Sequence, residues 1–457
     1  MTDLDLVVAG GTVVTPELGR LRADVGVAGE TIACLASPGT LSGDRVVDAR
    51  GNHVFPGVVD PHTHFGFYRS LAEDAESESR SGLVGGVTTT GNMWRTPDPY
   101  LERLDDLLGT AENRYYSDFF LTLGPLTPTH VDEIPDLVEE YGVTTYKWLQ
   151  HYKGTLVDRF GVDREMDDRL GDDVMAALAS LDVPTTLGYH SENVEIRRPI
   201  ERRLEASGRD DYGAFEESFP GYAETQSMVA GAALARQHDY DDSFYAVHVS
   251  SRRTADELAA LHRAGYRVTG ETCTHYLTLT AEECDDRMKV GPPIRHEADR
   301  ETLWERVADG TIQCVATDHT PNTLDVKVGE TIWDSKRGFP SNPAMLPLVL
   351  SEGYHEGRIS LERAVAVTST NNARAWNIYP EKGSIRVGTD ADLVVVDLDE
   401  TRTVTPELLG GAADYSVYDG REVTGWPSHT VVRGRVCYAE GRVEAEPGHG
   451  EHIERPV

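Results

Sequence analysis

The sequence predicts an α/β protein in which a central unit with a parallel sheet is joined to a smaller β domain. Between about residues 55 and 380, apolar strand-like runs alternate with segments such as DRLGDDVMAALASL and ADELAALHRAGY, whose leucines and alanines recur at helical spacing. Strands that alternate with helices imply a parallel sheet. The chain of 457 residues exceeds the roughly 100–200 residues of one ordinary domain. It suits one large domain with a smaller appendage.

Both ends of the chain have a different pattern. Residues 1–54 contain short strand-like runs broken by glycine, as in LDLVVAGGTVV and DVGVAGETIACLAS, and these predict a small sheet. Short strands return after residue 380, in KGSIRVGTDADLVVVDLD and SHTVVRGRVCYAEGRV. We therefore expect residues 1–54 and 381–457 to form one β domain beside a central domain of residues 55–380. The last residues, EAEPGHGEHIERPV, are expected to form an irregular arm.

The composition is that of a folded, strongly acidic protein. Hydrophobic residues make up 39% of the chain, which excludes wholesale disorder. The 77 Asp and Glu residues outnumber the 43 Lys and Arg residues, and the net charge is −34. Such a field repels phosphate backbones and anionic membranes, so neither nucleic acid nor a membrane is an expected partner. Only six basic residues are lysines. An acidic, lysine-poor surface suggests a halophilic protein, with an ordinary acidic enzyme as the alternative.

The cysteines and the N-terminus indicate a cytoplasmic protein. The five cysteines are odd in number, widely spread and without a CxxC pair. This pattern predicts neither a disulfide framework nor a thiolate zinc site. The opening MTDLDLVVAGGTVV is acidic, and no apolar run approaches the roughly 18 residues of a membrane span.

Several apolar runs of the central region lead into residues with metal-binding or acid–base chemistry. These residues are His62 and His64 in FPGVVDPHTH, Lys147 in GVTTYK, His190 in VPTTLGYH, His248 in FYAVHVSS, and Asp318 in TIQCVATDH. If the parallel strands close into a barrel, their carboxyl ends meet at one mouth. The sequence therefore predicts one constellation from five strand ends.

The HxH pair is the strongest single signal in this set. On an extended chain, His62 and His64 point to the same face, and their neutral nitrogens can bind one cation such as zinc. Two further histidines and an aspartate exceed what one tetrahedral ion needs, which favours a two-metal site. An ammonium group cannot bind a metal, so Lys147 needs another explanation. If CO₂ carbamylates the lysine, it becomes an anionic bridge between two metals.

These motifs resemble those of the cyclic amidohydrolases of the hydantoinase and dihydropyrimidinase type, with allantoinases and dihydroorotases as close relatives. The motifs that carry the resemblance are GVVDPHTHF at 57–65, AEDAESESRSGLVGGVTT at 72–89, YKWLQHYKG at 146–154, HSEN at 190–193, PGYAETQSM at 220–228, VHVSS at 247–251, GETCTHYL at 270–277, VGPPIR at 290–295, DGTIQCVATDHTP at 309–321 and KGSIRVGTDADLVV at 382–395. They span nearly the whole chain. The resemblance implies a (β/α)₈ barrel with a β-sandwich domain formed from both termini.

The resemblance also implies the roles of the site residues. His62 and His64 would bind one divalent metal together with Asp318, while His190 and His248 would bind a second, with zinc the expected ion in both places. Lys147 would be the carbamylated bridge.

The implied reaction is hydrolysis of a cyclic amide or imide by a hydroxide that bridges the metals. Tyr152, five residues after Lys147, would donate to the oxyanion, and Asp318 would carry the proton to the leaving nitrogen. The expected partners are a small neutral cyclic ureide and further copies of the chain in a dimer or tetramer.

The choice within the family depends on the residues around the ring. Gly66 stands where dihydroorotases have a carboxylate-binding arginine, so we expect a neutral ring unless Arg69 or Arg95 replaces that residue. Tyr152 favours hydantoinase or dihydropyrimidinase over allantoinase. Gly291 occupies a substrate-binding position where hydantoinases usually have serine. The remaining substrate contacts, expected to form an apolar wall, are Phe65, Leu149 and Leu156.

Other possibilities stay open at this point. Allantoinase and dihydroorotase activities are the nearest alternatives, and a non-catalytic scaffold or a mononuclear deaminase are more distant ones. Glu192 and Asn193 are candidates to orient His190, with a surface role as the alternative. His319 is expected either to face substrate or to pack. His151 is expected to be structural or to lie at the surface.

Overall fold

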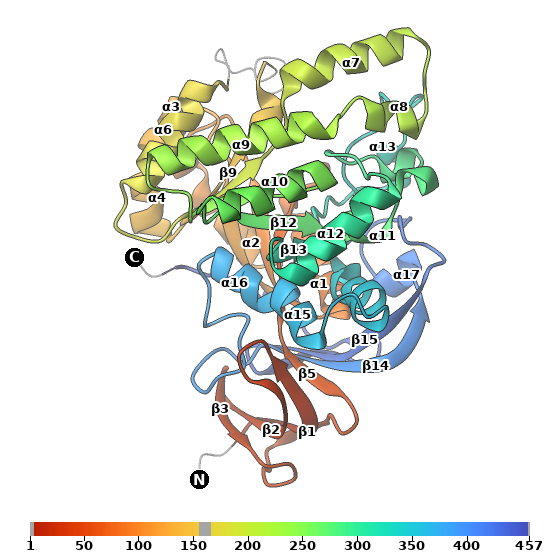
Figure 1. The fold of residues 1–457 in the computed structure, drawn as a ribbon. Helices are drawn as coiled ribbons and strands as arrows, with labels where there is room; N and C mark the ends of the chain where they lie inside the picture. Colours follow the sequence, from red (N-terminus) through yellow and green to blue (C-terminus); the bar gives the residue numbers. More distant parts are fainter. Residues whose placement is uncertain (1–3, 155–165, 456–457) are drawn as a thin grey trace.

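The computed structural model describes residues 4–154 and 166–455, and its larger part is a barrel of parallel strands surrounded by helices (Figure 1). Each barrel strand is hydrogen-bonded to the next in chain order. The strands are β6 (Val58–Thr63), β7 (Val87–Trp94), β8 (Asp118–Leu123), β9 (Thr145–Leu149), β10 (Thr186–His190), β11 (Phe244–Ala246), β12 (Thr269–Cys273) and β13 (Cys314–Ala316). The first and last strands meet where Thr63 bridges His319 just beyond β13. The predicted (β/α)₈ barrel is thereby confirmed.

Helices and short helical turns connect the strands and cover the outside of the barrel. They are α1 (Leu71–Gly82), α2 (Leu104–Glu112), α3 (Pro128–Asp132), α4 (Ile134–Tyr141), α6 (Asp168–Ala179), α7 (Val194–Ala206), α8 (Tyr212–Glu217), α9 (Gly221–Gln237), α10 (Arg252–Arg263), α11 (Thr274–Thr278), α12 (Glu297–Asp309), α13 (Leu324–Lys327), α14 (Met345–Val349), α15 (Leu361–Val365), α16 (Asn371–Ala375) and α17 (Pro406–Leu409). Local signals explain their ends. The Ser251 side chain caps α10 by accepting from the Thr254 amide, and Gly310 ends α12 with φ of 91°.

The two ends of the chain form a separate mixed sheet, as expected. Its strands are β1 (Leu6–Thr15), β2 (Gly19–Ala28), β3 (Thr31–Ala36), β4 (Arg45–Asp48), β5 (His53–Pro56), β14 (Leu393–Thr403), β15 (Glu422–Val432), β16 (Arg435–Ala439) and β17 (Arg442–Val443). Antiparallel pairing of β5 with β14 joins the N-terminal and C-terminal strands into one hydrogen-bonded sheet. Apolar side chains of both halves, such as Val25 and Val431, share one core.

The sheet curls so that its opposite ends touch. A Cβ atom on Gly434, in the turn between β15 and β16, would lie 2.3 Å from the Gly29 carbonyl oxygen at the tip of the β2–β3 hairpin. Gly434 also has φ of 74°, a conformation that L side chains rarely adopt. Only glycine fits there, and the close approach gives the single sheet its sandwich-like shape.

A buried ionic network joins the mixed sheet to the barrel. The Lys382 ammonium contacts Asp118 at the start of β8 and Asp392 just before β14, and Arg433 also contacts Asp118. Burial alone would lower the pKa of Lys382, but the nearby Asp392 and Asp390 carboxylates raise it. Loss of one partner would leave an uncompensated charge, so this network fixes the two parts together.

The C-terminal residues lie against the barrel. The Phe119 amide in β8 donates to the Glu451 carbonyl at 3.0 Å, and the Ile453 amide donates to the Phe119 carbonyl at 2.8 Å. The expected irregular arm is thus partly paired with a barrel strand. Within the described ranges, no helix has the length and apolar character needed to cross a membrane.

Candidate metal centre

The six residues predicted as metal ligands come together at the carboxyl end of the barrel. His62 lies in β6, His64 directly after it, Lys147 in β9, His190 at the end of β10, and His248 and Asp318 two residues after β11 and β13. None of them is more than 9% exposed. The barrel therefore places them as the strand-end pattern predicted.

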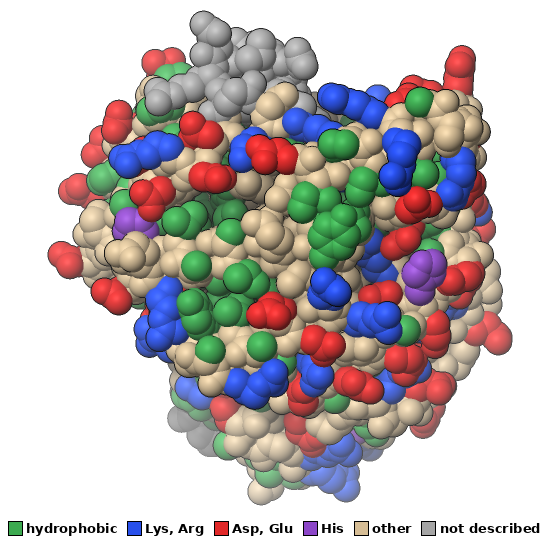
Figure 2. Space-filling model, turned by 45° about the horizontal axis from the view of Figure 1, so that its top comes forward, with side chains coloured by type: hydrophobic (Ala, Val, Ile, Leu, Met, Phe, Trp, Pro, Cys, Tyr) green, Lys and Arg blue, Asp and Glu red, His purple; other side chains and the backbone are tan. Residues whose placement is uncertain are grey.

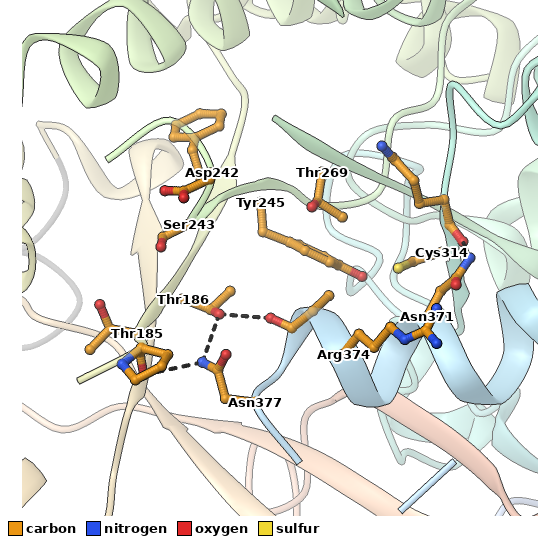
Figure 3. Close-up of a pocket in the computed structure, with 14 residues that line it drawn as sticks. Thr185, Thr186, Asp242, Ser243, Tyr245, Thr269, Cys314, Asn371, Arg374 and Asn377 are labelled. Atoms are coloured by element: carbon orange, nitrogen blue, oxygen red, sulfur yellow. Dashed lines mark hydrogen bonds between the residues drawn. The ribbon is translucent and has the colours of Figure 1, made fainter. Parts of the chain in front are cut away.

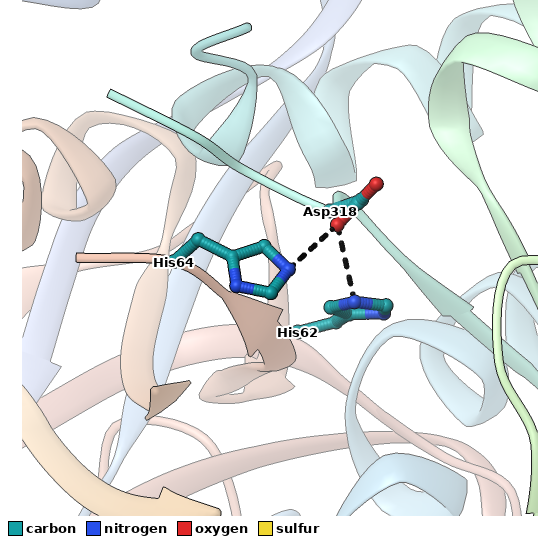
Figure 4. A group of neighbouring side chains, drawn as sticks. All are labelled: His62, His64 and Asp318. Atoms are coloured by element: carbon teal, nitrogen blue, oxygen red, sulfur yellow. Dashed lines mark ion pairs between the residues drawn. The ribbon is translucent and has the colours of Figure 1, made fainter. Parts of the chain in front are cut away.

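His62, His64 and Asp318 form the tightest group (Figure 4). Asp318 Oδ1 lies 3.1 Å from His62 Nε2 and 3.0 Å from His64 Nε2, and one ligand atom from each residue falls within 4.8 Å of the others. Burial alone would raise the pKa of Asp318, but the neighbouring His62 and His64 hold it well below its usual value. Burial also lowers the pKa of His64 to about 3. A carboxylate and neutral imidazole nitrogen are the forms that bind a divalent cation.

A second pair of imidazoles lies beside this group. His190 Nδ1 and His248 Nε2 are 2.7 Å apart, and burial lowers the pKa of both rings. Lys147 Nζ lies 2.6 Å from His62 Nε2, and burial lowers the pKa of this lysine to about 8. His248 and Asp318 have positive φ values of 43° and 51°. Strained backbone of this kind is found where a side chain must be aimed at a functional site.

The donor set has the chemistry to hold divalent metal ions. Four imidazoles, one carboxylate and one lysine amine converge in a buried space, where each unpaired polar atom would be costly. Nitrogen and oxygen donors of this kind suit zinc and similar ions. The lowered pKa increases the fraction of neutral Lys147 amine, which is the form that reacts with CO₂.

Glu271 in β12 supports the centre and was not predicted as a site residue. Its Oε1 atom lies 2.8 Å from His62 Nδ1 and accepts from the His248 amide at 2.9 Å. Its Oε2 atom accepts from the Tyr245 hydroxyl at 2.9 Å. A carboxylate behind a metal-binding histidine fixes the ring tautomer and orientation. The only signal for this role in the sequence was the position of Glu271 within the GETCTHYL motif.

The other candidates around the ligands have separate roles. Glu192 Oε2 lies 3.1 Å from His190 Nε2, whereas the Asn193 side chain caps α7 by accepting from the Glu195 and Ile196 amides. Buried His319 is held by the Ser341 and Asn342 amides, which donate to Nδ1, and its Nε2 lies 3.2 Å from Glu78. His319 therefore packs behind Asp318 rather than facing substrate.

A cavity of about 310 Å³ opens onto the ligands at this end of the barrel. Tyr152, Leu149 and Gly291, which were predicted as substrate contacts, line this cavity. Phe65 does not, because its ring is turned into the core and stacks on Tyr115 at a centroid distance of 5.7 Å. Leu156 lies outside the described residues.

The described part of the cavity wall is mostly polar, so the expected apolar wall is not seen there. Arg95 was predicted only as a possible replacement for the missing arginine, and the lining residues that the prediction did not name are Phe67, Tyr68, His151, Glu201, Lys289, Thr320, Trp333, Asp334, Ser335, Lys336 and Arg337. Arg95 Nε donates to the Tyr152 hydroxyl oxygen at 2.6 Å, and Arg95 Nη1 lies 3.3 Å from His64 Nδ1. Arg69 instead pairs with Asp74 at 3.1 Å. Loop direction, which the strand pattern does not specify, decided which of these arginines enters the cavity.

A second cavity of about 310 Å³ lies at the opposite end of the barrel (Figure 3). It is lined by residues at the beginnings of β10, β11, β12 and β13, together with α16. Thr186 donates to the Ala375 carbonyl at 2.7 Å, and the Asn377 amide donates to Thr186 at 3.1 Å. The six predicted ligands do not line this cavity, so we assign the active site to the other end.

Known proteins resemble this chain along its whole length. Residues 242–437 match the amidohydrolase family. An allantoinase from Rubrobacter xylanophilus is 34% identical over 98% of this chain and 97% of its own, and an L-hydantoinase from Paenarthrobacter aurescens is 31% identical over 99% and 98%. The crystal structure of a dihydropyrimidinase from Brevibacillus agri superposes with a TM-score of 0.90 at 26% identity over 98% of both chains. The fold, the buried ligand set and these similarities together show that the chain belongs to the amidohydrolase family, among enzymes that act on cyclic amides.

Proposed function

We propose that the protein hydrolyses a five- or six-membered cyclic amide or imide of the hydantoin or dihydropyrimidine type. The observation that carries this proposal is the convergence of four histidines, a lysine and an aspartate below a cavity that Tyr152 also lines. Its relatives include enzymes named hydantoinase and a structure named dihydropyrimidinase.

His62, His64 and Asp318 would hold one divalent cation and His190 and His248 a second, with carbamylated Lys147 between them. Zinc is the ion we propose for both places. Two such cations would lower the pKa of water to about 7 and polarise the ring carbonyl.

The chain's own groups supply the proton transfer and the oxyanion contact. Asp318, ionised because its pKa is held well below the usual range, would take the proton from the nucleophile and give it to the leaving ring nitrogen. The Tyr152 hydroxyl would donate to the developing oxyanion. Arg95 donates to the same phenol oxygen at 2.6 Å, which orients the hydroxyl and strengthens it as a donor.

Allantoinase activity is the second candidate. The 34% identical relative is an allantoinase, and the polar cavity wall suits a ring with a polar substituent. Tyr152 favours the hydantoinase assignment, because the allantoinase pattern generally lacks a tyrosine at this place. Dihydroorotase stays a further alternative.

A hydrolysis screen of the purified, metal-loaded protein tests the proposal. The panel is dihydrouracil, 5-substituted hydantoins, allantoin and dihydroorotate, with metal content measured on the same sample. We expect ring opening with about two metals per chain. One metal per chain would favour a mononuclear deaminase, and no metal with no turnover would favour a scaffold.

We further propose that the protein is adapted to high salt and assembles as a dimer or tetramer. Acidic side chains are spread across the face in Figure 2 and interspersed with basic ones. Self-repulsion from a net charge of −34 should destabilise the folded state until salt screens it. The unfolding temperature should therefore rise steeply between low salt and molar KCl, and light scattering would give the assembly state.

A further inference from the structure

We propose that Arg337 and Arg95, which line the same cavity as the metal ligands, bind a carboxylate on the ring substituent. The substrate would then be an acidic cyclic ureide. This inference rests on the proposed ring hydrolysis and specifies its substrate class. It replaces the expectation of a neutral ring, which was drawn from Gly66 and from the expected apolar wall.

Arg337 lines the cavity and forms no direct ion pair with any described residue. Among the described residues, its guanidinium has neither an ion-pair nor a hydrogen-bond partner, and it packs against the Phe219 ring at 5.0 Å. Arg337 is half-buried, and burial together with the positive charge of Arg197 lowers its pKa, whereas the Glu192 and Glu201 carboxylates oppose this shift. The neighbouring Arg197 is paired with Glu192 and Glu201 instead. An anionic ligand would supply the direct ion-pair partner that Arg337 lacks among the described residues.

The segment that carries Arg337 is held in place by two buried lysines. Lys327 Nζ donates to the carbonyls of Lys336 and Gly338 at 2.7 Å each, on both sides of Arg337. Lys289 Nζ donates to the Trp333 carbonyl at 3.0 Å. These lysines serve the backbone of a loop in a chain with only six lysines in total. A fixed backbone preorganises the guanidinium and reduces the entropy lost when a ligand binds.

Gly291 accommodates the arginine. A Cβ atom at this position would lie 3.3 Å from Arg337 Cδ and 3.4 Å from Nη1, tighter than most side-chain contacts. Because Gly291 has no side chain, the Arg337 guanidinium can occupy this space in the cavity. This arrangement gives a physical reason for the glycine where the related enzymes usually have serine.

Arg95 provides the second guanidinium. Its Nη1 atom lies 3.3 Å from His64 Nδ1, and this contact requires the ring nitrogen to accept. If His64 held a metal through Nε2, Nδ1 would carry the ring proton and could no longer accept. Nη1 of Arg95 would then be available to another acceptor in the cavity. Besides burial, the positive charges of Arg95 and Arg337 both lower the pKa of His151, so both guanidinium groups act on the same part of the cavity.

A carboxylate is the ligand chemistry that this arrangement fits. The planar guanidinium matches the two oxygens of a carboxylate, and Arg forms stronger, more directional contacts with it than Lys does. The cavity of about 310 Å³ has room for a small ring with a short acidic arm. The carboxylate meant here is exocyclic and exists before ring opening, unlike the one that hydrolysis creates at the metal ligands.

A matched substrate pair tests the proposal. We would measure kcat/KM for 5-carboxymethylhydantoin and for its neutral amide, 5-carbamoylmethylhydantoin, with the metal-loaded protein. We expect the wild type to favour the acid at least tenfold and Arg337→Met to reduce this ratio to near one. Arg22→Met, which removes an exposed arginine on β2, should keep the wild-type ratio. A wild type without preference for the acid, or a variant that loses both substrates equally, would overturn the proposal.

Calorimetric titration separates this inference from the proposed reaction. If no ring is opened, the hydrolytic proposal fails, yet the dissociation constants of the two compounds still decide the carboxylate site. Tighter binding of the acid by at least tenfold, lost in Arg337→Met, supports it, and equal affinities contradict it. If Arg337→Met does not fold, Arg337→Lys provides the second variant, since it keeps the charge without the planar fork. An unchanged acid-to-amide ratio in that variant would also count against the proposal.

Discussion

The two ends of the barrel hold cavities of similar volume, about 310 Å³ each, but very different chemistry. At the carboxyl end, the wall contains ionisable side chains whose pKa values are shifted, including Lys147, Asp318 and His151. At the amino end, Thr186 and Asn377 bond to each other and to backbone carbonyls. Cavity size therefore does not identify the active site. The active site is identified instead by the carboxyl ends of the parallel strands, where the last residues of the strands meet.

The backbone differs between the two ends as well. His248 and Asp318 at the mouth have positive φ values of 43° and 51°. Among the described residues that line the amino-end cavity, no non-glycine residue other than Asn377, with φ of 60°, has this conformation. Substitutions at the mouth should therefore change metal binding and chemistry, whereas those at the other end should change mainly stability.

The largest effect is expected from Lys147→Ala. The variant should lose most of its metal and more than about 10³-fold in turnover, because the bridge between the two ligand groups is gone. Short carboxylic acids plus metal should restore part of the activity, measured as initial rate against acid concentration. In Lys147→Met, the methionine side chain occupies the space of the lysine, so added carboxylic acids should not restore activity. Full metal content in Lys147→Ala would contradict the proposed bridge.

Tyr152→Phe should lower kcat by about 10²–10³-fold while both metals stay bound, the usual scale for loss of one oxyanion donor. Steady-state kinetics and metal analysis of the same preparation check this. Unchanged turnover would reduce Tyr152 to a packing residue and move the assignment towards allantoinase.

Metal loading of the metal-free protein should accelerate with pH. Burial lowers the pKa of Lys147 to about 8, so the neutral amine rises from about one tenth of the protein at pH 7 to about nine tenths at pH 9. At constant dissolved CO₂ and metal, we expect about a tenfold faster return of activity at pH 9. The pKa of Lys147 in the folded protein, about 8, lies below its ordinary value of 10.5. The unfolded state therefore binds more protons between pH 8 and 10.5, and the stability of the metal-free protein should rise with pH across that range. A loading rate independent of pH or CO₂ would exclude carbamylation.

Tyr245→Phe should give the smallest effect and shows where the two ends are connected. Tyr245 lines the amino-end cavity, yet its hydroxyl donates to Glu271, which contacts His62. We expect weaker metal affinity, but by less than the roughly 10–100-fold typical when a direct partner of a metal ligand is lost. Arg374→Met, at the same cavity, should leave affinity and kcat/KM within about twofold, because its exposed pair with Glu17 affects stability alone. Competition with a chelator measures the metal affinity of both variants.

The ligand set could be predicted from the sequence because its signals are local. Alternation along the extended chain puts His62 and His64 on one face, and an apolar run before Lys147, His190, His248 and Asp318 marks a strand that ends there. The terminal strands could also be predicted from the sequence. Only the structure shows that β5 and β14 join them into one curled sheet.

Much of the substrate side of the site was decided by tertiary structure. Phe65 follows His64 and therefore points the other way, into the core beside Tyr115, while Arg95 and Arg337 arrive from loops far apart in the chain. Strand periodicity fixes which way a strand residue faces, but a loop takes its direction from the groups that anchor it. Lys327 shows this, since its bonds to the Lys336 and Gly338 carbonyls fix the loop that carries Arg337. The sequence by itself thus determined the catalytic chemistry, and long-range packing determined the charge that the substrate meets.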